Sequence, residues 1–61
     1  LTTREIEILG IMAQGFKNRE IAEKLDISEK TVKTHLNRIF KKLGVNSRSK
    51  AILTLMEKNI L

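Results

Sequence analysis

The sequence has 61 residues, no cysteine, one histidine and a formal net charge of +5. Such a chain forms one small domain near the lower limit for independent folding. Its composition excludes a disulfide framework and a His/Cys metal site, and its apolar runs are too short to span a membrane. We expect no metal, no cofactor and a cytoplasmic protein, and the start at Leu1 rather than Met suggests a fragment of a longer one.

The first predicted helix follows Thr2. Thr2 is a suitable N-cap, Glu5 three positions later completes a capping box, and Leu1 is spaced to pack on Ile6. Gly15 is expected to end this helix. Apolar residues recur at helical spacing and form its inward stripe: Ile8, Leu9, Met12 and Ala13.

A second, shorter helix is predicted to begin after Asn18, which is a good N-cap residue. Its residues for the core are Ile21, Ala22 and Leu25. Residues 26–28 leave room only for a turn. Asp26 stands where many helix-turn-helix turns place glycine, and Asp tolerates the left-handed backbone conformation better than most residues.

A third helix is predicted over about residues 29–43. Ser28 is its N-cap, and Glu29 in the first turn interacts favourably with the helix dipole. Gly44 is expected to close the helix, with Val45 packing back on Phe40 in a Schellman arrangement.

Charge and hydrophobicity separate by face on the third helix. The apolar stripe consists of Val32, Leu36, Ile39 and Leu43. The opposite face holds Lys30, Lys33, Thr34, Asn37, Arg38 and Lys41. Four of these six side chains are cationic and none is acidic, although a helix that serves only solubility gains nothing from excluding acids. Long donors beside short donor/acceptors suit the base edges of a DNA major groove.

The wider charge distribution agrees with this interpretation. Residues 1–27 carry four Lys or Arg and five Asp or Glu, whereas residues 28–50 carry seven Lys or Arg and a single acid. Concentrated positive charge is typical of a surface that binds a polyanion. A solvated basic helix is the alternative that composition alone leaves open.

The last predicted helix is capped by Ser47 and runs to about Asn59. It offers a core stripe of Ala51, Ile52 and Leu55. A second face is also largely apolar: Ser49, Leu53, Met56 and Ile60. Because a monomer has little use for two apolar faces on its last helix, this face favours an interface, although a broad buried stripe with a loose apolar terminus is an alternative.

Three segments carry a family resemblance. LTTREIEIL, NREIAEKLDISEKTVKTHLNRIFKKLG and SRSKA occur in the order and spacing of the LuxR/NarL/GerE-type helix-turn-helix domain, over essentially the whole chain. The resemblance implies an all-α, compact four-helix domain over residues 1–61. It also implies that this domain is the effector part of a response regulator or quorum-sensing-type regulator, which carries an upstream regulatory domain. In such a protein the third helix enters the major groove of specific double-stranded DNA, and the fourth helix pairs two copies of the domain.

The resemblance also implies residue roles. The positions expected to face bases are Lys30, Lys33, Thr34 and Asn37. Those expected to approach phosphates are Asn18, Ser28, Thr31 and Arg38. Lys41 joins the phosphate set because it lies further along a groove-bound helix. His35 belongs to the family pattern but is expected to be a packing residue.

Other function classes fit less well. No nucleophile–base pair, phosphate-binding Gly loop or metal cluster indicates an enzyme. A basic amphipathic helix also suits an anionic membrane, but the core needs the apolar stripe of this one. RNA binding is disfavoured because there are no stacking aromatics on an exposed sheet.

Overall fold

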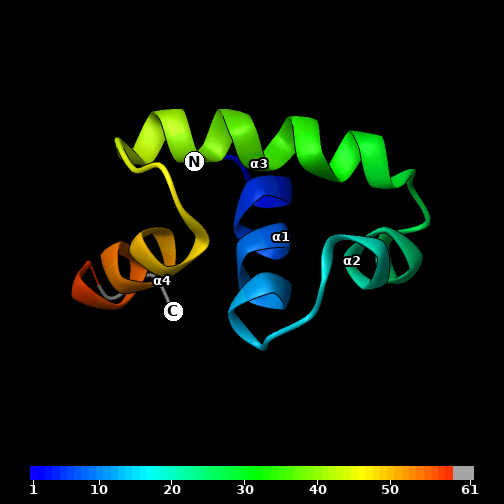
Figure 1. Cartoon of the computed structure of the whole chain (residues 1–61), viewed down its shortest axis with the longest axis horizontal. Coiled ribbons are helices and arrows are strands. Elements are labelled where there is room, and N and C mark those ends of the chain that lie inside the picture. Colours follow the sequence, from blue (N-terminus) through cyan, green and yellow to red (C-terminus); the bar gives the residue numbers. More distant parts are fainter. Residues whose placement is uncertain (59–61) are drawn as a thin grey trace.

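The computed structural model describes residues 1–58, and every secondary-structure element in that range is a helix. The elements are α1 (Thr3–Ala13), α2 (Asn18–Leu25), α3 (Glu29–Leu43) and α4 (Arg48–Glu57). Figure 1 shows α3 along one edge of the domain, with α1, α2 and α4 all on the same side of this helix. The predicted all-α, four-helix fold is confirmed. No helix within residues 1–58 has the length and apolar character needed to cross a bilayer.

Three of the four helices begin with the predicted cap. The Thr2 hydroxyl accepts from the Glu5 amide at 3.1 Å, and Glu5 Oε1 accepts from the Thr2 amide at 2.8 Å, so the capping box is present. Ser28 and Ser47 accept from the amides three residues later, at 3.0 and 3.2 Å. These bonds satisfy amides that lack a partner inside the helix.

The prediction for the start of α2 was wrong. Lys17 is the N-cap, and Asn18 is already the first helical residue. The Lys17 side chain has no acceptor, so only half of a capping box forms, in which Glu20 Oε1 accepts from the Lys17 amide at 2.8 Å. The Asn18 side chain is therefore available for a contact outside its own helix.

Left-handed residues end α2 and α3. Asp26 has φ 56° and ψ 45°, which confirms the expectation that Asp replaces glycine in this turn. Gly44 has φ 71°, and the Val45 amide donates to the Phe40 carbonyl at 3.0 Å. That bond, together with the one from Gly44 to the Lys41 carbonyl at 3.2 Å, forms the predicted Schellman motif.

The core lies between α3 and the remaining helices, and α3 packs against each of them. Its buried apolar side chains are Ile8, Leu9, Met12, Ile21, Ala22, Val32, Leu36, Ile39, Ala51 and Leu55. Leu25, Leu43 and Ile52 are only partly buried against this cluster. Leu1 and Ile6 stay 46% and 41% exposed, so the expected contact between them leaves much of both side chains in water.

One ion pair ties α1 to the last turn of α3. Lys42 Nζ lies 2.9 Å from both carboxylate oxygens of Glu5. Glu5 itself is only 4% exposed. The hydrogen bond from the Thr2 amide, and then the Lys42 ammonium, lower the pKa of the Glu5 carboxyl to about 2. Glu5 therefore caps its own helix and also binds the end of α3.

The lowered pKa predicts a pH-dependent contribution of Glu5 to stability. Because the folded-state pKa lies below the unfolded value of 4.5, ionised Glu5 stabilises the fold above that pH, and the contribution is lost as pH falls toward 2. Glu5→Gln should lower the midpoint of urea unfolding at pH 7, and the difference from the unsubstituted chain should shrink between about pH 5 and pH 2.

Circular dichroism at several pH values measures this difference. Glu7→Gln is the matched control, because Glu7 lies on the same helix in an exposed pair with Arg4 at 3.6 Å and should cost less at pH 7. An equal effect of the two substitutions at every pH would contradict the role given to Glu5.

Candidate nucleic-acid interface

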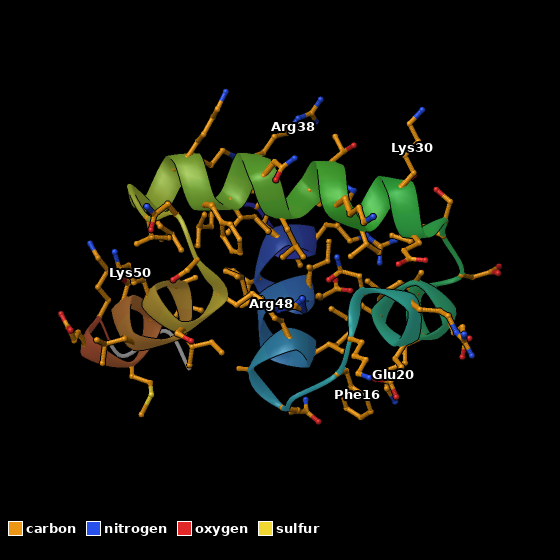
Figure 2. The ribbon with its side chains drawn as sticks, viewed as in Figure 1. Phe16, Glu20, Lys30, Arg38, Arg48 and Lys50 are labelled. Atoms are coloured by element: carbon orange, nitrogen blue, oxygen red, sulfur yellow. The ribbon has the colours of Figure 1, made fainter. Side chains whose placement is uncertain are left out.

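The polar face of α3 is open to solvent. All six side chains predicted for this face are exposed: Lys30, Lys33, Thr34, Asn37, Arg38 and Lys41. Figure 2 shows Lys30 and Arg38 pointing away from the other three helices. The opposite side of the helix is sealed into the core by Val32, Leu36 and Ile39, which are 0%, 4% and 0% exposed.

The cations of this face form no ion pair with the acids of residues 1–58. Within residues 1–58 the ion pairs are Arg4–Glu7, Arg19–Glu23 and Lys42–Glu5. Lys42 is thus the only cation of α3 that is neutralised inside the described part of the chain. Four exposed cations of one face therefore have no ion-pair partner in the described part of the chain: Lys30, Lys33, Arg38 and Lys41.

Hydroxyl groups at the start of α3 are partly engaged by the helix itself. Ser28 Oγ accepts from the Thr31 amide and lies 2.8 Å from the Thr31 hydroxyl. The Thr34 hydroxyl donates to the Lys30 carbonyl at 3.1 Å. Whichever of the Ser28 and Thr31 hydroxyls accepts in the bond between them keeps its own proton to donate. These contacts also hold the side chains in defined positions on an exposed surface.

Asn18 lies away from this helix face, at the first residue of α2, and is partly buried. Its Oδ1 accepts a hydrogen bond of 2.8 Å from Arg48, the first residue of α4. Arg48 was not predicted as a site residue, because a contact across 30 residues leaves no local pattern in the sequence. His35 is partly buried, in keeping with a packing residue.

The second face of α4 is exposed as predicted. Leu53 and Met56 are 56% and 60% exposed, and Ser49 is also exposed. Ile60, the remaining member of that face, and Asn59, the predicted helix end, lie outside the described residues. On the opposite side Ala51 and Leu55 are fully buried, so one short helix has an apolar face in the core and another in water.

Residues 1–58 contain no group of three or more His, Asp or Glu side chains placed to hold an ion. What the described surface does offer is a convex, basic helix face with amide and hydroxyl groups between its cations. Such a face suits contacts to a polyanion and to the edges of nucleic-acid bases.

Comparison with known sequences identifies relatives of the whole domain. Transcriptional regulatory protein YdfI of Bacillus subtilis (strain 168) is 46% identical over 61 residues, which are 100% of this chain and 29% of YdfI. DegU of Brevibacillus brevis is 51% identical over 53 residues, or 87% of this chain and 22% of DegU. The chain therefore spans less than a third of the length of these relatives.

Solved structures show the same fold. The response regulator ChrA of a heme-sensing two-component system superposes with a TM-score of 0.96 at 51% identity, covering 100% of this chain and 30% of ChrA. The transcription factor GerE superposes with a TM-score of 0.93 at 43% identity, covering 100% of this chain and 91% of GerE. Residues 1–55 match the family model for bacterial regulatory proteins of the luxR family, and the chain belongs to that family.

Proposed function

We propose that this domain binds specific double-stranded DNA sequences as the effector part of a bacterial transcription regulator. The observation that carries the proposal is the face of α3, where four exposed cations without an ion pair in residues 1–58 lie beside exposed Thr34 and Asn37. A helix of 15 residues is about 22 Å long, and the major groove admits one α-helix across its width. The buried stripe on the opposite side leaves the polar face free to enter the groove.

The proposed roles follow position along α3. Lys30, Lys33, Thr34 and Asn37 occupy the first two and a half turns and contact base edges. Lys donates to guanine acceptors, Asn pairs with adenine, and the Thr methyl touches a thymine methyl. Arg38 and Lys41 lie further along and bind phosphates, and Ser28 and Thr31 do so at the start of the helix. Phosphate contacts supply most of the affinity, and base contacts supply selectivity.

The exposed apolar face of α4 is proposed to pair two domains about a two-fold axis. Leu53 and Met56 are more than half exposed, and burying them against a second copy would remove apolar surface from water. A symmetric pair would place two α3 helices on half-sites about 34–36 Å apart. We propose that this pairing forms on DNA, where two half-sites bring two copies together.

The rest of the working protein is also part of the proposal. YdfI and DegU are transcriptional regulatory proteins more than three times as long as this chain, and ChrA is a response regulator. By analogy, an upstream regulatory domain controls this domain in a cytoplasmic protein.

Selection of bound duplexes from a random pool tests the function directly. A sequence-specific domain enriches a defined motif, and two-fold pairing predicts a palindromic one. If the selection enriches no motif and the protein co-sediments with anionic liposomes, a membrane surface is the favoured partner instead.

Lys33→Ala tests base contact. The substitution should cost about 1–3 kcal/mol on the selected site and less on a random duplex, because a base contact contributes only where the base matches. Fluorescence anisotropy with both duplexes measures the two losses. Lys58→Ala removes the same charge from the end of α4 and serves as the control. Equal losses on both duplexes would show that Lys33 contacts no base.

Lys41→Ala tests phosphate contact against a neighbouring cation. Removing one phosphate contact should weaken binding to all duplexes and reduce the slope of log K against log salt by about one unit. Lys42→Ala is the matched control, because Lys42 is paired with Glu5 and should alter stability while leaving the slope unchanged. An unchanged slope for Lys41→Ala would remove Lys41 from the phosphate set.

Leu53→Asp tests the pairing face. Since Leu53 is exposed, the substitution should leave the unfolding midpoint nearly unchanged, yet weaken binding to a duplex with two half-sites more than to one with a single half-site. Ile6→Asp places the same charge on an exposed apolar residue of α1 and is the control. Unaltered two-site binding would rule out the face around Leu53 as the pairing surface.

A further inference from the structure

Arg48 joins two segments that are far apart in the sequence. Its Nη1 donates to Asn18 Oδ1 at 2.8 Å, and its Nη2 donates to the Phe16 carbonyl oxygen at 3.3 Å. The two acceptors lie 30 and 32 residues before it. Figure 2 shows the Arg48 side chain extending from α4 toward the centre of the domain, unlike Lys50 on the same helix. The guanidinium thus links α4 to the connection between α1 and α2.

The chemistry of the guanidinium decides which way the Asn18 amide faces. Arginine carries only donors, whereas an asparagine amide has an oxygen that accepts and a nitrogen that donates. Arg48 therefore bonds the oxygen, and the Asn18 Nδ2 group is turned to the other side of the amide carbon. The second bond, to the Phe16 carbonyl, fixes the plane of the guanidinium and keeps the first bond aligned.

The Asn18 nitrogen then has two N–H groups to offer. Within residues 1–58 none of the side-chain hydrogen bonds uses Asn18 Nδ2, and the only bond of the Asn18 side chain is the one to Arg48. A phosphate oxygen is an acceptor without a proton to donate, so it needs the nitrogen side of the amide. The reverse orientation would present an oxygen to an anion and repel it.

We propose that Arg48 is a positioning residue for DNA binding, which locks the Asn18 amide with its donors toward a backbone phosphate. This inference rests on the proposed function. Arg48 itself contacts no DNA: it is partly buried, and two of its donors are engaged inside the protein. Since Arg48 is also the first residue of α4, the helix that carries Leu53 and Met56 is bonded directly to a phosphate-binding side chain.

A double-mutant cycle with a salt titration tests the proposal. Asn18→Ala and Arg48→Ala should each weaken binding to the selected duplex about three- to tenfold, the range expected for one lost hydrogen bond. The double variant should bind no worse than the weaker single variant, because Arg48 acts through Asn18. The salt slope should stay unchanged for Arg48→Ala, since no ionic phosphate contact is lost.

Lys50→Ala is the matched control, as Lys50 is an exposed cation in the same turn of α4. Its effect should add to that of Asn18→Ala. If Arg48→Ala melts near the assay temperature, Arg48→Lys replaces it; this variant keeps the charge but not the paired donors, and should still show no further loss in the Asn18→Ala background.

The outcomes separate this inference from the function on which it rests. Failure of the unsubstituted chain to bind any duplex would reject the proposed function. Binding that is insensitive to Asn18→Ala, additive losses for the two substitutions, or a salt slope that falls by about one unit with Arg48→Ala would each reject the positioning role and leave DNA binding standing. In the last case Arg48 would be a direct phosphate contact.

Discussion

The burial of one stripe of α3 is the constraint on which the rest of the structure depends. Val32, Leu36 and Ile39 are almost completely removed from water, and they fix the rotation of the helix about its own axis. With 3.6 residues per turn, this rotation also fixes the outward direction of every other side chain of α3. The same packing that stabilises the domain therefore presents its cationic face.

Helix ends hold α3 in that orientation. Ser28 caps its first turn, a Schellman motif closes its last turn, and Lys42 bonds the nearly buried carboxylate of Glu5. The core of so small a domain supplies only a few kcal/mol, so these contacts contribute a large share of its free energy of unfolding. Lys42 stabilises the fold through its ion pair with Glu5, whereas the neighbouring Lys41 is exposed and is proposed to bind a phosphate.

The two proposed surfaces are linked through the protein interior. Arg48 begins α4 and holds Asn18 at the start of α2, so the helix proposed to pair two domains bonds directly to a side chain proposed to meet DNA. The link consists of one planar group and two hydrogen bonds. It joins two helices whose bonded residues lie 30 positions apart in the sequence.

The sequence by itself determined the helices, three of the four N-caps, the left-handed Asp26 and the segregation of charge on α3, because all of these depend on residues within a few positions of one another. The start of α2 was predicted one residue too late, although the bond from the Lys17 amide to Glu20 that marks it is local. Tertiary structure alone decided that Glu5 binds Lys42 and that Arg48 reaches Asn18 and Phe16. Those contacts join residues 30 or more positions apart, and a local pattern cannot encode which distant acceptor a long, flexible cation will meet once the helices pack.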